Sequence, residues 1–300
     1  MCQCDNSEAV RGPCRPSSLT DEMWEVIRPL LAVRNLRKGG GVRKYGDRLV
    51  LDSIFYVLRS GRQGRMLPRD LMPWDAAHRR FTKWRRDGSW DRIHDELRRQ
   101  LRIGAGRDPE PSAAGIDAQS IKTSEGGEAR GFDTGKRTTG RKRHVIVDTM
   151  GLLLVVAVTS ASVQDRAGGR TVLARIAAAF RTVSLVWSDG GYANSVDCTL
   201  LSWARDALGI VVEIAKRTND VRGFKVLPRR WSVQRSFGWL VRNRRLARDY
   251  ERLTATSEAM IKVAMIRLML VRLAGQSSRW SHESHHKTAR TKTTEDLIVA

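Results

Sequence analysis

Two kinds of hydrophobic periodicity divide the chain. From Leu19 to about Ile103, apolar residues recur at the three- and four-residue spacing of amphipathic helices. Thr20 or Asp21 can cap the first helix. The apolar face of that helix is expected to carry Met23, Trp24, Ile27, Leu30 and Leu31. Further helices are predicted at 49–58, 74–87 and 90–101, with glycine and proline between them.

The pattern changes beyond a predicted linker at 104–113 (GAGRDPEPSA). Short apolar runs bounded by turn residues now predict strands. The expected strands are 114–121, 143–148, 152–158, 185–189 and 210–214. The expected helices are 166–180, 194–208, 229–250 and 257–273. This order predicts an α/β fold with a mixed sheet flanked by helices over 114–275, preceded by a small all-α domain at 19–103. Residues 1–18 and 276–300 are predicted to be disordered tails.

The charge balance narrows the class of partner. The 300 residues contain 54 Lys and Arg against 32 Asp and Glu, a formal net charge of +22. Such a charge favours a polyanion, most simply nucleic acid. A membrane span is not expected, because the longest uncharged apolar run, 152–158, is far shorter than the ~20 residues required. The N-terminus lacks a basic segment followed by an apolar one, so we expect a cytoplasmic protein without a signal peptide.

The cysteines do not suggest a metal site. Three of them, Cys2, Cys4 and Cys14, lie near the N-terminus, and no histidine follows at zinc-ligand spacing. Cys198 stands alone. We therefore expect reduced thiols, the first three of them in a disordered tail.

The segment 74–87 combines an apolar face with a strongly basic one. Ala77, Phe81 and Trp84 share a face with Trp74 at helical spacing. The remaining surface carries Arg79, Arg80, Lys83 and Arg86. A basic helix among short helices is typical of a helix-turn-helix-like DNA-binding domain. The alternative is a plain helical bundle with a solvated basic face, and the net charge favours DNA binding.

Two aspartates stand where sheets often carry chemistry. Asp117 lies within a predicted buried strand and Asp189 ends another. A carboxylate among apolar residues is costly unless it is paired or binds a metal ion. Strand-borne carboxylates also hold magnesium for phosphoryl transfer. The alternatives are that Asp189 caps the glycine turn that follows and that Asp117 pairs with an arginine. Asp148 and Asp165, near other strand ends, are predicted to be surface or turn residues.

Several blocks of sequence resemble a known family. GIDAQSIKTSEGGEARGFDTGKRTTGRKRHVIVDTMGLLL, VWSDGGY and RRWSVQRSFGWLVRNRRLARDYERL are similar to the DDE transposases of small bacterial insertion sequences. LTDEMWEVIRPLL and LVLDSIFYVLRSG resemble the N-terminal helical domain of that family. The likeness spans roughly residues 19–255, with the blocks in the family's order.

The resemblance implies an RNase H-like core and a reaction on DNA. It implies binding to double-stranded DNA at terminal inverted repeats, and cleavage and strand transfer with Mg²⁺, for which Mn²⁺ can substitute. It further implies a homodimer when two ends are synapsed, in a nucleoid-associated bacterial protein.

The resemblance also assigns a catalytic triad, with one departure. The family's first and second Asp match Asp117 and Asp189, which are expected to be the metal ligands. The third residue is a Glu in the block Trp-x-Val-Glu-Arg-x-Phe-x-Trp-Leu, and here that position is Gln234, expected on the inner face of its helix. Because magnesium favours charged oxygen ligands, the alternative to an active enzyme is an inactive derivative that binds DNA or represses.

Neighbouring residues offer no obvious replacement for the missing acid. Glu251 would stand about 25 Å from Gln234 along an uninterrupted helix. Glu213 lies on the last predicted strand, in a block without a catalytic role in the family. A second departure is Gly64, where the family usually has Trp, which predicts weaker packing of the helical domain.

A track of basic residues is expected to hold DNA beside these acids. Contacts of this kind position the phosphate backbone without reading sequence. The alternative for each residue is a solvated surface. The predicted track comprises Lys142, Arg143, Arg229, Arg230, Arg235, Arg242, Arg244 and Arg245.

Overall fold

The structure, a computed structural model, describes residues 15–32, 44–192, 199–215 and 228–276. All four cysteines and most of both predicted tails lie outside these ranges. In the part of the chain that is described, no helix is long and apolar enough to cross a membrane.

The four predicted N-terminal helices are all present. They are α1 (Asp21–Ala32), α2 (Asp47–Ser60), α3 (Trp74–Arg86) and α4 (Ser89–Gly104), with a short 3-10 turn, η1 (Gly64–Met66), between α2 and α3. Met23, Ile27 and Leu31 of α1 are buried as expected. On α3 the predicted apolar face holds except at its first residue, because Trp74 is 41% exposed.

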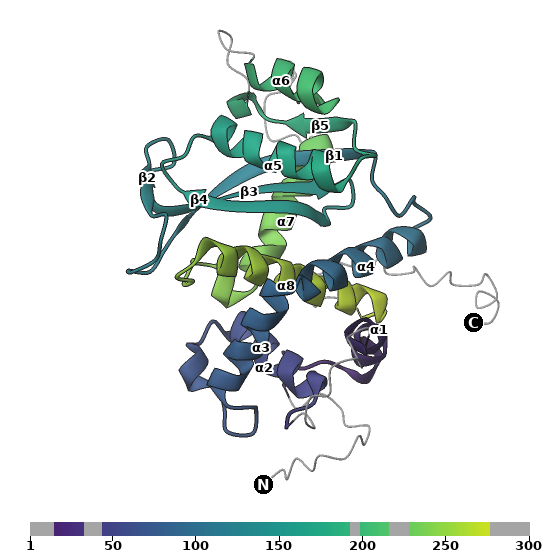
Figure 1. Cartoon of the computed structure of the whole chain (residues 1–300), viewed down its shortest axis with the longest axis vertical. Helices are drawn as coiled ribbons and strands as arrows, with labels where there is room; N and C mark the ends of the chain where they lie inside the picture. The colour runs from purple at the N-terminus through teal and green to yellow at the C-terminus, as the bar shows by residue number, and fades with distance from the viewer. Residues whose placement is uncertain (1–14, 33–43, 193–198, 216–227, 277–300) are drawn as a thin grey trace, which may run out of the picture.

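A six-stranded mixed sheet forms the other half of the molecule (Figure 1). Its strands are β1 (Ala113–Lys122), β2 (Gly131–Asp133), β3 (Thr138–Asp148), β4 (Leu153–Ser160), β5 (Leu185–Ser188) and β6 (Val211–Ile214). Five of these strands follow the order β4-β3-β1-β5-β6, and β2 pairs with the start of β3. Pairing is antiparallel from β4 to β1 and parallel from β1 to β6. The predicted mixed sheet flanked by helices is therefore confirmed.

Strand β3 is longer than the hydrophobic pattern indicated. It begins at Thr138, whereas the apolar run predicted a start at 143. The added residues include Arg141 and Lys142, which the pattern would place in water, yet both are buried. Pairing with β1 on one side and with β2 and then β4 on the other extends the strand through this polar segment.

Helices cover both faces of the sheet. α5 (Asp165–Ala179) contacts β1, β3 and β4, and α6 (Thr199–Leu208) packs beside it. On the opposite face lie α7 (Pro228–Val241), against β1, β3 and β5, and α8 (Thr254–Leu273), against β4 (Figure 1).

The predicted helix 229–250 is too long. Helix α7 ends at Val241, and a 3-10 turn, η3 (Arg244–Leu246), follows. The Asn243 amide donates to the carbonyl oxygens of Trp239 and Leu240, each at 3.3 Å, which satisfies acceptors at the end of the helix. Further on, Asp249 forms a β-bridge with Thr123, so the chain is extended there.

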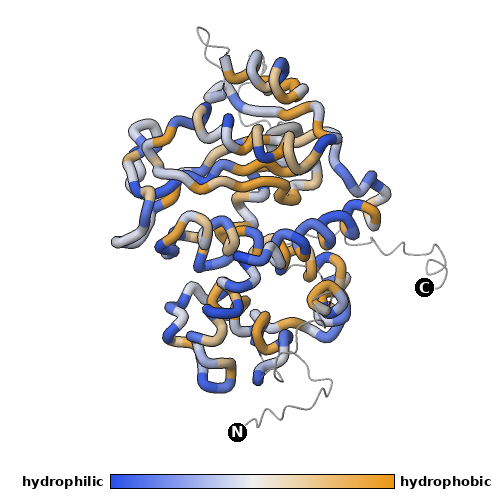
Figure 2. Tube along the Cα trace, in the orientation of Figure 1, coloured by the Kyte–Doolittle hydropathy of each residue, from blue (hydrophilic) through white to orange (hydrophobic). Residues whose placement is uncertain are grey.

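Two apolar cores lie on the two faces of the sheet, where the strands are among the most hydrophobic parts of the trace (Figure 2). One core joins α5 and α6 to residues such as Ile116 and Ile146. The other runs from α1–α4 through α8 to Val145 and Val147. The N-terminal helices thus share a core with the sheet, and the predicted domain division at 104–113 remains a prediction.

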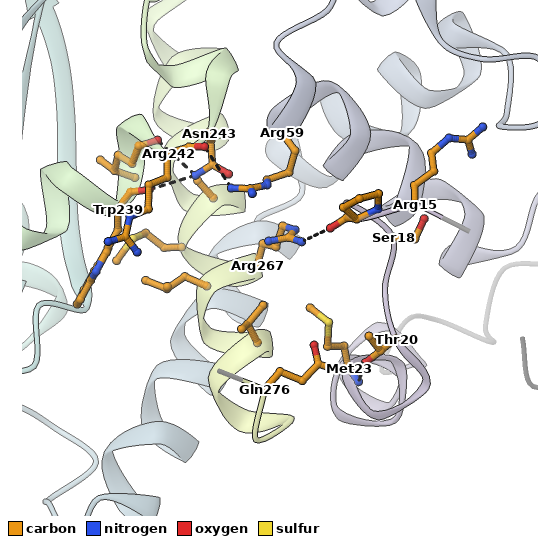
Figure 3. Close-up of a pocket in the computed structure, with 16 residues that line it drawn as sticks. Arg15, Ser18, Thr20, Met23, Arg59, Trp239, Arg242, Asn243, Arg267 and Gln276 are labelled. Carbon is orange, nitrogen blue, oxygen red and sulfur yellow. Dashed lines mark hydrogen bonds between the residues drawn. The ribbon is translucent and has the colours of Figure 1, made fainter. Parts of the chain in front are cut away.

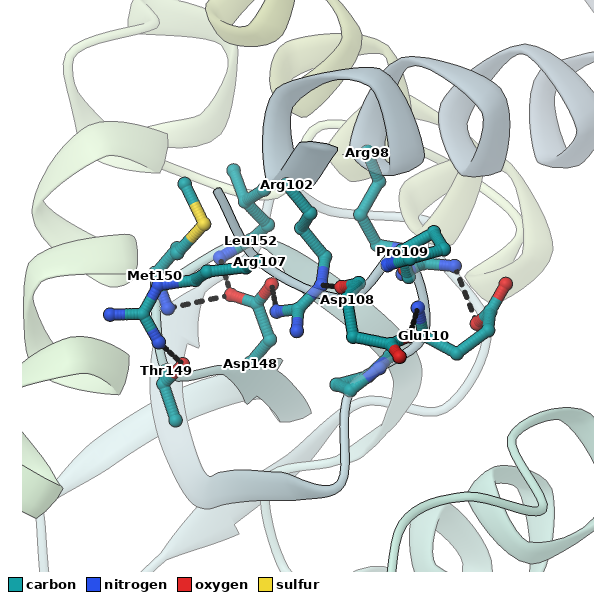
Figure 4. A network of polar contacts seen from close by, with 12 residues as sticks. Arg98, Arg102, Arg107, Asp108, Pro109, Glu110, Asp148, Thr149, Met150 and Leu152 are labelled. Atoms are coloured by element: carbon teal, nitrogen blue, oxygen red, sulfur yellow. Dashed lines mark hydrogen bonds and ion pairs between the residues drawn. The ribbon is translucent and has the colours of Figure 1, made fainter. Parts of the chain in front are cut away.

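A buried polar network joins α4 to the sheet (Figure 4). Asp148 was predicted to lie at the surface, but it is fully buried and pairs with Arg102 at 2.6 Å. Arg102 also donates to the carbonyl oxygen of Asp108, and Arg98 to that of Pro109 and to the Glu110 carboxylate. The predicted linker therefore lies along α4, held by these arginines.

Candidate active site

The sheet register brings the two predicted metal ligands together. Strands β1 and β5 are parallel neighbours, with Ala113 opposite Leu185 and Gly115 opposite Trp187. Extending this register by two residues places Asp117 beside Asp189. Neighbouring strands are about 4.8 Å apart, so this extended register would bring the two aspartates to neighbouring positions just beyond the end of β5. Both side chains are half-exposed, which leaves this edge open to a ligand.

The backbone fixes one oxygen of each carboxylate. The Asp117 Oδ1 atom accepts the amide hydrogen of Ala118 at 2.7 Å. The Asp189 Oδ1 atom accepts that of Gly191 at 2.9 Å, within the 3-10 turn η2 (Gly190–Tyr192). Asp189 therefore caps the glycine turn, as one alternative predicted. A capped carboxylate keeps further lone pairs, so this contact is compatible with metal binding.

Tyr192 adds a buried hydroxyl beside these acids. Its side chain is 1% exposed, and its Oη has no hydrogen-bond partner among the described residues. Burial and the charges of Asp117, Asp165 and Asp189 raise the pKa of Tyr192 well above its usual value. The phenol is therefore a neutral hydrogen-bond donor at every pH of interest. Sequence reasoning passed over this residue, although it stands three positions after the second aspartate in VWSDGGY.

A glycine on α5 makes room for the tyrosine ring. A Cβ atom at Gly169 would lie 2.7 Å from Tyr192 Cε1, closer than such contacts allow. The helix can approach the site only because this position has no side chain.

Two lysine side chains near this site, Lys142 and Lys136, contact protein acceptors. Lys142 lies 2.9 Å from Asp165 and 3.1 Å from Asp133, and its side chain is almost wholly buried. Burial lowers the pKa of Lys142, but the two carboxylates outweigh it and raise the value overall. Lys136 donates to the carbonyl oxygen of Ala118 at 2.8 Å. Lys142 was predicted to contact DNA, but its ammonium is buried among protein partners. Asp165 opens α5 and forms a structural ion pair.

Arg143 also differs from its prediction. It is fully buried, and it donates to the carbonyl oxygen of Leu246 at 3.0 Å. Burial lowers its pKa to about 10. A guanidinium inside the fold cannot contact a DNA phosphate, so its role in this conformation is to hold η3 against the sheet.

Gln234 lies on the exposed side of α7, not on its inner face. Val233 and Phe237 provide the buried side of that helix. The helix packs against β1 and β5, the strands that position the two aspartates. The amide of Gln234 is therefore accessible to solvent on an element that adjoins the acidic pair.

The turn between β3 and β4 anchors α7. The Ser236 hydroxyl donates to the carbonyl oxygen of Gly151 at 2.6 Å, and Arg235 donates to that of Met150 at 2.8 Å. Gly151 has a positive φ of 79°, and a Cβ there would lie 2.9 Å from Ser236 Oγ. The close approach of the turn to α7 therefore requires glycine at this position.

Glu251 cannot supply the missing carboxylate, although the reason differs from the one predicted. It does not continue the helix, and it pairs with Arg245 at 2.8 Å. The nearby residue Asp249 bridges Thr123, six residues beyond Asp117 on the same chain segment. At about 3.3 Å per residue, that separation is roughly 20 Å.

The predicted DNA-contacting residues divide into exposed and engaged groups. Arg79, Lys83 and Arg86 of α3 are exposed, as are Arg242 and Arg244 after α7. Arg80 is half-buried, 5.7 Å from the Trp84 ring centre. Arg235 lies 4.5 Å and 4.8 Å from the rings of Trp231 and Trp239, and Arg245 pairs with Glu251. The side chains of Arg229 and Arg230 lie outside the described residues.

The donor set fits a divalent cation only in part. Asp117 and Asp189 supply the hard, charged oxygens that Mg²⁺ prefers. Within the described ranges, no group of three His, Cys, Asp or Glu side chains could hold a metal ion. The arrangement is thus a two-carboxylate site with a neutral amide on the adjoining helix.

Comparison with known proteins gives two family matches. Residues 108–269 match a family described as "Transposase DDE domain", and residues 19–94 match one described as "Putative transposase of IS4/5 family". The chain is also 32% identical over 117 residues to the "Insertion element IS402 uncharacterized 16.2 kDa protein" of Burkholderia cepacia. That alignment covers 38% of this chain and 78% of the relative. No solved structure gave a significant match.

Proposed function

Since the chain belongs to the DDE transposases of insertion sequences, we propose that it binds the terminal inverted repeats of its element and acts on the DNA there by metal-dependent cleavage and strand transfer. The observation that carries the proposal is the parallel register of β1 and β5, which, continued by two residues, would set Asp117 beside Asp189. The family implies a divalent metal ion, and Mg²⁺ is the ion that this donor set favours.

The two aspartates would hold the cation through oxygens at the end of β5. When bound, the cation would supply Lewis-acid activation of the phosphate and of the attacking hydroxyl. Tyr192 would donate a hydrogen bond from its buried phenol to a carboxylate of the aspartate pair. The attacking oxygen would come from water in cleavage and from a DNA 3′-hydroxyl in strand transfer, so no covalent intermediate with the protein is required.

Gln234 would weaken metal binding at this site while keeping the position of the third ligand. Its amide oxygen retains the reach of Glu but lacks the negative charge, which costs affinity for a second cation. This residue also supports the second candidate function, an inactive derivative that binds the element ends and acts as a repressor. The two candidates share DNA binding and differ only in cleavage.

Recognition of the ends is proposed to lie with α3, which presents Arg79, Lys83 and Arg86 to solvent. We further propose that two copies assemble when both ends are held, because strand transfer joins both ends of one element.

The decisive experiment compares three proteins on a duplex that carries the element end, with Mg²⁺. They are the chain as it stands, Gln234→Glu, and Gln234→Glu combined with Asp117→Ala. We expect Gln234→Glu to raise the cleavage rate at least tenfold with DNA affinity nearly unchanged, because a charge that stabilises the leaving oxygen acts mainly in the transition state. The double variant should lose that gain.

Each result bears on the proposal. If the parent cuts and Gln234→Glu cuts no faster, a carboxylate at position 234 is not required and Gln234 is not the third-ligand position. If none of the three cuts while all bind, the repressor function stands.

A further inference from the structure

A cavity of about 710 Å³ lies where the N-terminal helices meet α7 and α8 (Figure 3), and neither Asp117 nor Asp189 lines it. Its walls come from α1 and the segment before it, from α2, from the end of α7 and from one side of α8. Among the lining residues are Arg59, Trp239, Arg242, Met265, Arg267 and Gln276. We propose that this cavity is a binding site for a phosphate group, held between the guanidinium groups of Arg59 and Arg267.

The charge of the lining is entirely positive. None of the residues that line the cavity is Asp or Glu. Arg15 also lines it, but that side chain turns away to form an ion pair with Asp70 (Figure 3). Among the described residues, no carboxylate lies within ion-pair distance of Arg59, Arg242 or Arg267. The cavity therefore concentrates positive charge without internal compensation.

Backbone contacts hold the two central arginines in place. Arg59 Nη1 donates to the carbonyl oxygen of Arg242 at 3.1 Å, and Arg267 Nη2 donates to that of Pro16 at 2.9 Å. The Arg267 Nε atom is buried and has no hydrogen-bond partner within the described residues. Each guanidinium keeps donors that these carbonyl groups do not use. Two fixed cations with donors to spare are suited to an anion.

The pKa values of the two arginines are lowered in this arrangement. Burial, and then the charge of Arg59, lowers the pKa of Arg267 to about 10. Burial and the charge of Arg242 lower that of Arg59 in the same way. Each positive charge is thus less stable here than in water. A bound anion would offset the desolvation and the mutual repulsion together.

Phosphate is the anion that the geometry favours. Guanidinium forks match the oxygens of a phosphate in a bidentate manner and are the usual choice for it in proteins. The volume lies within the range of small-molecule sites, so it admits a pyrophosphate or one phosphodiester with its neighbouring sugars. The group can therefore come from a free polyphosphate or from a DNA backbone.

The test measures thermal unfolding of the full chain in EDTA with increasing pyrophosphate, against NaCl at equal ionic strength. We expect pyrophosphate to raise the melting temperature beyond the NaCl control. Arg267→Met and, as a second variant, Arg59→Gln should each weaken the apparent affinity at least tenfold. Arg181→Gln, which removes an exposed charge elsewhere, should behave as the parent does. Asp117→Ala should also keep the effect, because this site is not the aspartate pair.

A competition arm identifies the source of the phosphate. Displacement of pyrophosphate by a short duplex would assign the site to the DNA backbone, and failure of the duplex to compete would assign it to a free polyphosphate. The proposal is overturned if pyrophosphate stabilises the parent no more than NaCl does, or if the affinity survives in both Arg267→Met and Arg59→Gln. Because the measurement needs neither metal nor cleavage, its outcome is independent of the proposed transposase reaction.

Discussion

Arg102 of α4 and Asp148 at the end of β3 form an ion pair of 2.6 Å in which both side chains are buried. The same carboxylate accepts the backbone amide hydrogens of Met150 and Leu152, at 2.9 and 2.8 Å (Figure 4). The turn that contains these residues also accepts a hydrogen bond from the Ser236 hydroxyl of α7, at the carbonyl oxygen of Gly151. The pair therefore joins the N-terminal helices to the helix that carries Gln234.

We expect loss of this pair to be strongly destabilising. Arg102→Met would leave a buried carboxylate without its cation, which costs about 3–5 kcal/mol. Urea unfolding measures the change. The control is Arg107→Met, which removes an exposed arginine whose side chain donates to the Thr149 hydroxyl and should cost less than about 1 kcal/mol. Equal stability of the two variants would show that the pair does not hold α4 to the sheet.

Metal binding should depend on both aspartates. Titration with Mn²⁺ is expected to detect a weak site in the parent that disappears in Asp117→Asn and in Asp189→Asn. Asp206→Asn serves as a control, because that carboxylate is exposed on α6 and pairs with the adjacent Arg205. An unchanged titration in both active-site variants would remove the two-carboxylate site.

The basic face of α3 should govern DNA affinity. Lys83→Gln combined with Arg86→Gln is expected to weaken binding to the element end and to lower the slope of log affinity against log salt by up to about 1.8, at roughly 0.9 per phosphate contact. The control changes two exposed arginines near α5 and α6, Arg181→Gln with Arg205→Gln. If both double variants lose affinity equally, α3 has no special role and the solvated-face alternative holds.

Asp52 should make stability depend on pH. Burial raises its pKa to about 6, while Leu19 donates a backbone hydrogen bond to the carboxylate at 2.7 Å. A folded-state pKa above the unfolded value stabilises the fold below pH 4, and this contribution is lost as the pH rises through 6. Asp52→Asn should therefore be more stable than the parent at pH 7.5, by up to about 3 kcal/mol.

The check is the melting temperature of both proteins between pH 4 and 8. The gap between Asp52→Asn and the parent should close as the pH approaches 4. A gap that stays constant over this range would mean that the Asp52 carboxyl does not titrate abnormally.

Two glycines should respond oppositely to alanine. A Cβ at Gly168 of α5 would lie 2.0 Å from the buried His144 ring, so Gly168→Ala must displace the helix or the ring. A Cβ at Gly238 of α7 would meet nothing within 4 Å, so Gly238→Ala should stabilise by roughly 0.5–1 kcal/mol through helix propensity. Thermal unfolding distinguishes the two, and a destabilised Gly238→Ala would contradict the open environment of that position.

The surroundings of Gly64 do not support the expectation that this glycine weakens packing of the helical domain. Replacement of the family's Trp was expected to weaken packing, but a Cβ at Gly64 meets no atom within 4 Å and η1 buries no residue. The position is therefore peripheral to the apolar core, and nothing in the structure explains the family's preference for Trp.

Local pattern alone determined the main elements. The helices at α1–α4 and the apolar strands follow from periodicity, because a helix or strand must turn one repeating face toward a core. The family blocks then pointed to Asp117, Asp189 and Gln234 before any contact was known. Where such a pattern was broken, as by the polar start of β3 or the end of α7 at Val241, the prediction failed.

Tertiary structure decided where the charges go. Arg143 and Asp148 are charged residues that a local pattern assigns to water, yet both are fully buried. Their partners lie far along the chain, with Asp148 and Arg102 separated by 46 residues. A buried charge is tolerated only when the fold brings a partner to it. The register that relates Asp117 to Asp189 is likewise a property of two strands. Neither the buried ion pair nor the strand register can be predicted from one segment, because each depends on a second segment far along the chain.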